Sequence, residues 1–365
     1  MSEPAEEVEM EYRRPPVRVA LMGLGRAMFA DHYPIYKEHP SMFQVVAACD
    51  LLKERRDIVA KDFPDCKMFR QFADMLDEPG IDLVDIATCS EDHVKHAMLS
   101  LQKGLWTLLE TPMALTLGDA QILRGQAMKT KDHLIIFHRD MFSPDYLIAK
   151  RLMTDSRLGQ VYQIKIRSED FVRRDDWQCI KRLGGGAAYY AMPDLVLKAL
   201  RLLPSPPAQM WSELKRIASL GDAEDYAHLV LKTREEVSAD IEFSGGALPG
   251  SHSPSFEIRG ERGIFRIEAG SGEGVVSMIQ PSFSFPRRRS AVSTPPIQDL
   301  HEEFPMVSRP VFLTKGMMHG PTAFWHHLYN TVRTAKPFPL HLDESIETVK
   351  FAQLMKKTSP YGYVK

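Results

Sequence analysis

The stretch Val17-Arg-Val-Ala-Leu-Met-Gly23-Leu-Gly25-Arg-Ala-Met28 decides the fold of this chain. Its first six residues form an apolar run broken by one arginine, which is typical of a buried strand. Two glycines follow directly, and a helical pattern begins after them. In a G-x-G-x-x-G motif, the first glycine permits a tight turn, and the second lets the backbone approach a pyrophosphate on the helix N-terminus. We therefore predict a dinucleotide-binding turn at Gly23 and Gly25.

A second apolar run at residues 43–49 ends at Asp50, which is 25 positions after Gly25. An acidic residue at about this separation binds the ribose hydroxyls of a dinucleotide. Its negative charge repels a 2′-phosphate, so the sequence favours NAD. NADP stays the alternative, because Arg55 and Arg56 follow closely.

Short apolar runs alternate with helical patterns through the first 140 residues. Strands are predicted at 43–49, 81–87, 105–109 and 133–137, and helices at 53–63, 91–103 and 117–129. This alternation favours an α/β fold with a doubly wound parallel sheet, the Rossmann type. We predict that this domain spans residues 17–140 and that residues 1–16 form a flexible tail.

Strand patterns are grouped together in residues 141–365. A helix is expected at 144–154, strands at 161–167, 209–217, 226–233 and 236–243, and a hairpin at 256–267. Residues 281–315 are rich in Pro, Ser and Arg and are expected to form a long loop with little regular structure, and helices follow at 322–334 and 343–357. We predict an α+β domain with a mainly antiparallel open sheet for substrate binding and oligomerisation, and terminal helices that pack back on the first domain.

Composition excludes several classes of protein. The 365 residues contain 46 Lys and Arg against 48 Asp and Glu, which argues against a nucleic-acid partner. No apolar run approaches the ~20 residues that a membrane helix needs, and the N-terminus lacks the apolar core of a signal peptide. The four cysteines fit neither a zinc site nor a disulfide framework. We predict a cytoplasmic protein with no metal and a small-molecule substrate.

The order and spacing of several further motifs resemble the glucose–fructose oxidoreductase / inositol dehydrogenase (Gfo/Idh/MocA) family over nearly the whole chain after residue 16. The motifs are Val17–Gly25 with Asp50, the third-strand segment 81–93, the segment 104–116 containing Glu110-Thr-Pro112, His138-Arg139, Gly159-Gln-Val161, Leu183-Gly-Gly-Gly186 and Ile258-Arg-Gly-Glu-Arg-Gly263.

The resemblance implies NAD(P)-dependent redox chemistry on sugars, cyclitols or related polyols, and a homodimer or homotetramer formed through the C-terminal sheet. It implies cofactor binding by Gly23, Gly25, Arg26, Ala27, Asp50, Thr88, Ser90, His93, Glu110 and Thr111. For His93 the alternative is a structural role, and for Glu110 it is a partner of a helix N-cap.

The active-site positions depart from the family pattern. Thr111 stands where the family has lysine, Tyr190 where it has aspartate and Asp194 where it has histidine. Asp194 can act as a base if burial raises its pKa, and Tyr190 as an acid or oxyanion donor. A threonine hydroxyl can orient substrate or nicotinamide but cannot replace the lysine charge. The nearest candidate for that charge is Lys181.

Substrate contacts are expected from Tyr190 and from three further residues, Arg139, Arg174 and Trp177. For Arg139 the alternative is an interdomain ion pair, and for the charged run around Arg174 it is a solvated face. Arg287-Arg-Arg289 is expected as a solvated loop, with contact to an anion or a second subunit as its alternative.

We interpret the chain as an NAD(P)-dependent dehydrogenase or reductase with an unusual proton-transfer set. Two alternatives stay open at this point. One is a cofactor-binding protein without dehydrogenase activity. The other is a redox-neutral lyase or glycosidase reaction that uses tightly bound NAD.

Overall fold

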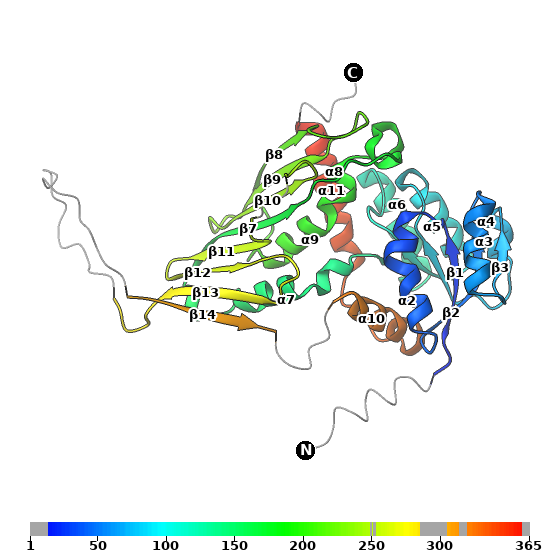
Figure 1. The fold of residues 1–365 in the computed structure, drawn as a ribbon, viewed down its shortest axis with the longest axis horizontal. Coiled ribbons are helices and arrows are strands. Elements are labelled where there is room, and N and C mark those ends of the chain that lie inside the picture. The colour runs from blue at the N-terminus through cyan, green and yellow to red at the C-terminus, as the bar shows by residue number, and fades with distance from the viewer. Residues whose placement is uncertain (1–13, 249, 251–252, 285–304, 314–319, 360–365) are drawn as a thin grey trace, which may run out of the picture.

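The computed structural model describes residues 14–248, 250, 253–284, 305–313 and 320–359, which form two β-sheets with associated helices (Figure 1). The first sheet is parallel, with the strand order β3-β2-β1-β4-β5-β6. Its strands are β1 (Val17–Met22), β2 (Phe43–Cys49), β3 (Lys67–Phe69), β4 (Leu83–Ile86), β5 (Trp106–Leu109) and β6 (Leu134–Ile136). The order reverses between β1 and β4, and ligands of such sheets bind beyond the strand ends at this point.

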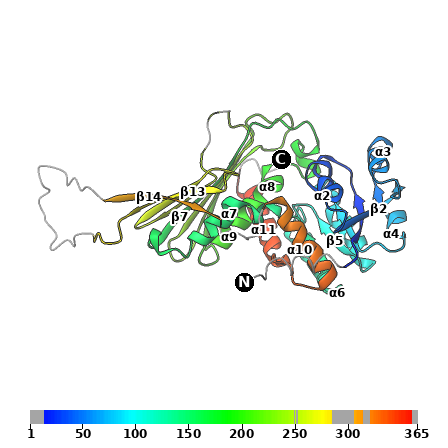
Figure 2. The same cartoon turned by 60° about the horizontal axis from the view of Figure 1, so that its bottom comes forward.

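Helices cover both faces of this sheet (Figures 1 and 2). They are the π-helical turn η1 (Met28–His32), α2 (Tyr33–Glu38), α3 (Lys53–Asp62), α4 (Phe72–Leu76), α5 (His93–Gln102) and α6 (Leu117–Lys129). The predicted parallel architecture is confirmed, with β1, β2 and α6 at the predicted residues. The short elements β3 and α4 were not predicted.

The second sheet has the order β14-β13-β12-β11-β7-β10-β9-β8, and all neighbours are antiparallel except β10 and β7. Its strands are β7 (Val161–Glu169), β8 (Gln209–Lys215), β9 (Tyr226–Lys232), β10 (Ser238–Ser244), β11 (Phe256–Gly260), β12 (Gly263–Ile267), β13 (Glu273–Ile279) and β14 (Met306–Phe312). The predicted hairpin at 256–267 is confirmed as β11 and β12.

One strand corrects the expectation of a long irregular loop at 281–315. Residues 306–312 form β14, which pairs along its whole length with β13 and places Pro310 opposite Val275. β14 is an edge strand, where a proline is tolerated because no neighbour needs its missing N–H. The arginines 287–289 lie outside the described residues.

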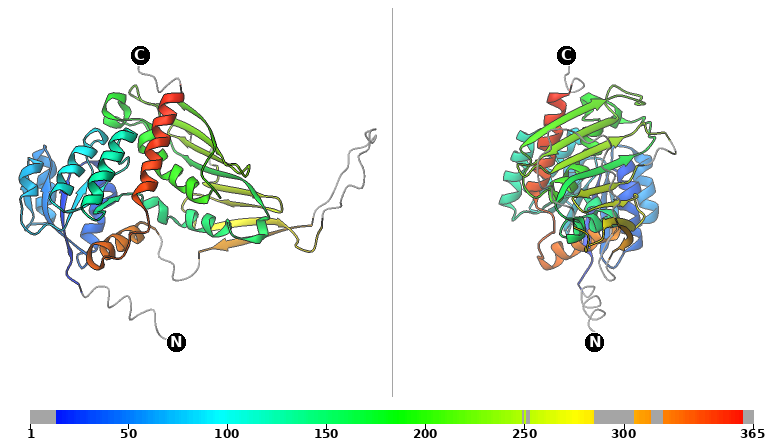
Figure 3. Two further views of the ribbon diagram at one scale, coloured as in Figure 1. Left: turned by 180° about the vertical axis from the view of Figure 1, so that it is seen from behind. Right: turned by 90° about the vertical axis from the view of Figure 1, so that its left-hand side faces the viewer.

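The helices of this half gather on one face of the second sheet and leave the other face open (Figure 3). They are α7 (Pro144–Leu152), α8 (Ala187–Tyr190), α9 (Met192–Leu202) and α11 (Leu342–Thr358). Successive strand residues point alternately to the covered and to the open face, so Ile164 and Ile241 are buried under the helices. The open face carries ion pairs such as Arg167–Glu242 (3.7 Å) and Arg266–Glu257 (2.7 Å).

The last two helices reach the first sheet. Gln353 of α11 accepts a hydrogen bond from the backbone N–H of Leu117 at the start of α6 (2.8 Å). Trp325 of α10 (Pro321–Thr334) is fully buried, and its ring lies 5.3 Å from that of Tyr36 and 5.8 Å from that of Phe43. Residues of both sheets and of α10 therefore belong to one hydrophobic core. In the described part of the chain, no helix has both the length and the apolarity to cross a membrane.

Candidate functional site

The turn after β1 has the form that a pyrophosphate requires. Gly23 has φ of +86°, and a Cβ added there would lie 2.7 Å from Cγ2 of Thr88 and 2.8 Å from the carbonyl oxygen of Ala87. A Cβ added at Gly25 would meet nothing nearer than 4.0 Å, so the space above it is open. A helix starts at Arg26 directly afterwards, and its first backbone N–H groups have no partner within the helix. The residues present fit a dinucleotide phosphate.

Asp50 lies at the end of β2 and braces this turn. Its Oδ2 accepts a hydrogen bond from the N–H of Leu24 (2.8 Å), and its Oδ1 accepts one from the N–H of Leu52 (2.8 Å). Arg55 approaches Oδ2 to 3.5 Å, whereas Arg56 donates to the carbonyl oxygen of Asp50 (2.6 Å). A carboxylate has about four acceptor positions, so capacity for ribose hydroxyls is left.

The predicted cofactor residue His93 lies at the start of α5 and is fully enclosed. Its Nδ1 lies 2.7 Å from the carbonyl oxygen of Pro112, and its Nε2 lies 3.1 Å from that of Thr88. Burial lowers the pKa of His93. The ring thus ties the loop after β4 to the loop after β5, which favours the structural alternative. Ser90 is buried in the same loop.

Glu110 belongs to a buried charge cluster that the sequence did not predict. His32 lies between two carboxylates, with Nε2 3.0 Å from Oε1 of Glu110 and Nδ1 2.9 Å from Oδ2 of Asp85. The hydroxyl of Tyr36 also donates to Asp85 (2.6 Å). Burial acts to lower the pKa of His32, but the two carboxylates outweigh it and raise this pKa to about 10. The imidazole is therefore a cation at neutral pH.

The other oxygen of Glu110, Oε2, accepts the backbone N–H of Thr111 (2.9 Å). The N-cap role considered for Glu110 is wrong, because Thr116 caps the helix that follows. Glu110 instead connects the His32 cluster to Thr111.

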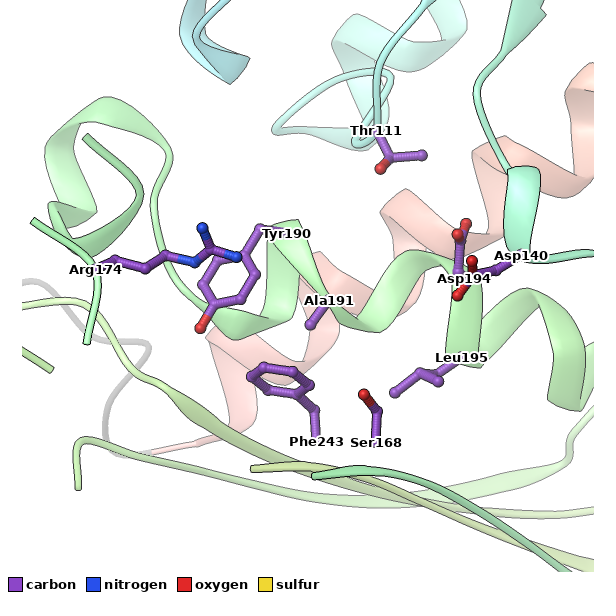
Figure 4. Close-up of a pocket in the computed structure, with 9 residues that line it drawn as sticks. All are labelled: Thr111, Asp140, Ser168, Arg174, Tyr190, Ala191, Asp194, Leu195 and Phe243. Carbon is purple, nitrogen blue, oxygen red and sulfur yellow. The ribbon is translucent and has the colours of Figure 1, made fainter. Parts of the chain in front are cut away.

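Four of the predicted catalytic or substrate residues meet in one pocket of about 200 Å³, shown in Figure 4. They are Thr111, Arg174, Tyr190 and Asp194. The remaining lining residues are Asp140, Ser168, Ala191, Leu195 and Phe243. Thr111 follows β5, so the pocket opens beyond the carboxyl ends of the parallel strands, at the side of the glycine turn.

Asp194, in the first turn of α9, has a partner that the sequence did not reveal. Nδ1 of His138 is hydrogen-bonded to its Oδ1, and Nε2 of His138 lies 3.0 Å from the hydroxyl oxygen of Ser345. His138 is buried, whereas the side chain of Asp194 keeps 21% exposure. The carboxylate therefore faces the pocket and the imidazole stands behind it.

Tyr190, four residues before Asp194, lies under the guanidinium of Arg174, whose Cζ is 4.6 Å from the ring centroid. Burial raises the pKa of Tyr190 to about 12, although the nearby arginine acts to lower it. The phenol is therefore protonated at neutral pH and serves as a hydrogen-bond donor rather than as a base.

The other predicted contacts lie around the pocket rather than in its lining. Arg139 forms an ion pair with Asp31 of η1 (2.5 Å), which favours the ion-pair role over contact with the substrate. Arg26 forms an ion pair with Asp176, next to Trp177. The backbone N–H of Lys181 donates to Asp222 (2.8 Å), and its side chain is not part of the lining.

A second lysine, absent from the predictions, lies close to the pocket. Lys198 is one helical turn beyond Asp194, its side chain is only 5% exposed, and its Nζ lies 3.6 Å from Oδ2 of Asp140. Asp194 and Lys198 are four residues apart on α9 and therefore lie on the same side of that helix, a spacing that the sequence already shows.

The glycine-rich segment before α8 determines the positions of Tyr190 and Asp194. Gly186 has φ of +113°, and a Cβ there would overlap the carboxylate of Glu224. Glu224 is buried and paired with Nζ of Lys356 (2.5 Å). Only a glycine lets the chain pass this ion pair and begin the helices that carry Tyr190 and Asp194.

Comparison with known families agrees with this arrangement. The model of the oxidoreductase family with an NAD-binding Rossmann fold (GFO_IDH_MocA) matches residues 17–138, and the model of the GFO/IDH/MocA C-terminal domain matches residues 146–266. The chain belongs to the GFO/IDH/MocA oxidoreductase family. A family model matches each half of the chain, which confirms the resemblance inferred from the motifs.

Individual relatives within the GFO/IDH/MocA family are distant. The chain is 27% identical over 307 residues to 1-carboxy-3-chloro-3,4-dihydroxycyclohexa-1,5-diene dehydrogenase of Comamonas testosteroni, covering 79% of this chain and 75% of the relative. It is 22% identical over 251 residues to scyllo-inositol 2-dehydrogenase (NADP⁺) IolW of Bacillus subtilis, covering 68% of each.

Among solved structures, the WlbA dehydrogenase of Chromobacterium violaceum, in complex with NADH and UDP-GlcNAcA, superposes with a TM-score of 0.74. It has 17% identity, over 95% of this chain and 94% of that one. This likeness shows the shared fold.

Proposed function

We propose that the chain is a nicotinamide-dependent oxidoreductase acting on a hydroxyl or carbonyl group of a small sugar- or cyclitol-like molecule. The observation that carries the proposal is the pocket in which Thr111, Tyr190 and Asp194 meet beyond the carboxyl ends of the parallel strands. The family and its scyllo-inositol dehydrogenase relative support the substrate class.

Gly23, Gly25 and the helix N-terminus at Arg26 and Ala27 would hold the pyrophosphate, with Asp50 at the adenosine ribose. Thr88, Ser90 and Glu110 belong to the loops that would border the nicotinamide. When bound, the cofactor supplies a hydride acceptor or donor. We favour NAD, because the Asp50 carboxylate opposes a 2′-phosphate.

Asp194 accepts the proton of the substrate hydroxyl in the oxidative direction and returns it in the reductive direction. His138, hydrogen-bonded behind it, holds the carboxylate toward the pocket. Tyr190 donates a hydrogen bond to a substrate oxygen, which its high pKa permits at neutral pH. The Thr111 hydroxyl orients the reacting oxygen, and Glu110 fixes the backbone of Thr111. These roles replace the proton-transfer set of the family pattern with residues from the same region.

The test is turnover of a panel of inositols, aldoses and acyclic polyols with NAD⁺ or NADP⁺, followed by nicotinamide absorbance. We expect turnover by the wild type and loss of most of it in Asp194→Asn. Cofactor binding without any absorbance change would contradict the proposal and favour a protein without dehydrogenase activity. Product analysis by NMR with catalytic NAD⁺ would then reveal a redox-neutral reaction.

We also propose that copies of the chain associate through the open face of the second sheet. That face carries the exposed Trp211 beside His228, together with charged side chains such as Arg167 and Glu242. Sedimentation analysis should find a dimer or tetramer, which Trp211→Asp weakens. All four cysteines are free thiols, and this supports a reducing, cytoplasmic location.

A further inference from the structure

The pocket has opposite charges at its two ends. In Figure 4, Arg174 and Tyr190 lie at one end and Asp140 and Asp194 at the other, with Thr111 above the space between them. A ligand that fills the pocket therefore meets a cation at one end and carboxylates at the other.

The carboxylates of Asp194 and Asp140 both interact with other side chains of the protein. Asp194 is hydrogen-bonded to His138. Asp140 lies 3.6 Å from the ammonium of Lys198 and 3.8 Å from Nε of Arg139. The acidic end of the pocket is thus balanced within the chain.

Arg174 is not balanced in this way. Among the described residues, no carboxylate lies within ion-pair distance of its guanidinium, and its Nε is buried without a hydrogen-bond partner. Tyr190 covers one face of the guanidinium, but its phenol is neutral and supplies no charge. The side chain of Arg174 is half-buried, and a charge that is partly removed from water favours an anionic ligand, because arginine stays charged in proteins.

We propose that Arg174 binds a carboxylate of the substrate, so that the substrate class is a hydroxy acid: a sugar acid or a carboxylated cyclic polyol. The inference rests on the proposed function and adds a feature of the substrate to it. The reacting hydroxyl or carbonyl then lies at the other end, beside Asp194 and Thr111.

The chemistry at Arg174 fits a carboxylate better than a phosphate ester. A planar guanidinium matches a carboxylate through two parallel hydrogen bonds, and one positive charge neutralises one monoanion. A phosphate dianion would bring a second negative charge into a pocket that also contains Asp140 and Asp194. The Tyr190 hydroxyl is a further neutral donor for a carboxylate oxygen.

The test compares acids with their neutral carboxamides by calorimetry, with the oxidised cofactor present. The probes are D-glucuronate and quinate, each beside its amide, and glucose 6-phosphate. We expect wild-type protein to bind at least one acid about tenfold more tightly than its amide, or better. Arg174→Gln should reduce this preference to roughly twofold or less, and Arg174→Lys should keep part of it, because lysine retains the charge without the planar fork.

Arg173→Gln is the matched control, because Arg173 is exposed and donates to the carbonyl oxygen of Ala218 (3.2 Å). It should leave the preference unchanged. Thermal unfolding of each variant shows whether it is folded, and the affinity for NAD⁺ shows whether Arg174 acts on the cofactor instead.

Several results would overturn the carboxylate assignment. These are equal binding of acid and amide by the wild type, no binding of either acid at millimolar concentration, tighter binding of glucose 6-phosphate than of both acids, or an equal loss of NAD⁺ affinity in Arg174→Gln. Failure of the proposed function has a different signature. Acids that bind in an Arg174-dependent manner without any redox turnover leave the assignment standing and contradict the oxidoreductase.

Discussion

The imidazole of His138 stands directly behind the carboxylate of Asp194 and is hydrogen-bonded to it, although 56 residues separate the two in the chain. His138 follows the last strand of the parallel sheet, and Asp194 lies on α9, which packs against strands β7 and β10 of the second sheet. The pair therefore joins the two halves of the molecule at the pocket where we place proton transfer.

The pair predicts a graded response to substitution. Asp194→Asn removes the proton acceptor, so kcat should fall by roughly 10²- to 10⁴-fold. His138→Asn should lower kcat less, change its pH profile and leave KM near the wild-type value, because His138 acts only through Asp194. Steady-state kinetics across pH measures both effects. Ser345→Ala, which removes the hydrogen bond on the far side of His138, is the control and should have the smallest effect. Equal kinetics of all three variants would exclude the assigned roles.

The cluster of His32, Asp85 and Glu110 predicts a pH-dependent stability. The pKa of His32 rises from 6.5 to about 10 in the folded protein, so the folded protein holds the His32 proton more tightly than the unfolded chain does. This stabilisation is complete below about pH 6.5 and is lost as the pH rises through about 10. Thermal unfolding between these values should reveal the loss.

His32→Gln should destabilise the protein by about 3–5 kcal/mol at neutral pH, because it leaves two enclosed carboxylates without their cation. The difference from the wild type should shrink toward alkaline pH. His133→Gln is the control, since that ring stacks on Trp106 away from the cluster. A difference that stays constant with pH would contradict a charged His32.

Asp50 predicts the choice of cofactor. Asp50→Asn removes the charge that opposes a 2′-phosphate but retains an oxygen for a backbone N–H. We expect the NADP⁺ affinity to rise relative to the NAD⁺ affinity by roughly tenfold, equivalent to about 1.4 kcal/mol. Calorimetry with both cofactors measures the ratio. Adding Arg55→Gln should reverse part of the gain, because Arg55 is the cation nearest to that carboxylate. Tighter NADP⁺ than NAD⁺ binding by the wild type would show that our preference for NAD is wrong.

Gly186 predicts a contrast between two glycine substitutions. Gly186→Ala should destabilise the protein and lower substrate affinity, because its methyl group would collide with Glu224 and shift the start of the helices behind it. Gly125→Ala should instead stabilise the protein by about 0.5–1 kcal/mol, because Gly125 lies exposed within α6 with open space around it. Chemical denaturation compares the two. A tolerated alanine at position 186 would show that the Glu224–Lys356 pair does not constrain the turn.

The sequence was most informative where local patterns determine structure. The strand at 17–22 and the glycine turn follow from apolar runs and from φ values that only glycine adopts readily, and both lie where predicted. β3 was missed because its three residues begin with an exposed lysine. β14 was missed because proline and arginine within it obscure the alternation of an edge strand.

The pocket was predictable only in part. Motif positions led to Thr111, Tyr190 and Asp194, and the structure brings them together. The partners of the pocket carboxylates could not be predicted. His138 contacts Asp194, and Lys198 contacts Asp140, only because tertiary packing brings these residues together. No periodicity or spacing records such contacts between distant segments.

Pro310 has a consequence for the behaviour of the protein at high concentration. An edge strand offers a row of unpaired backbone donors and acceptors on which another chain can build a continuous sheet. β14 lacks one of those donors at Pro310, and so it is a poor template for strand addition. We therefore expect folded molecules to resist sheet-to-sheet aggregation at this edge.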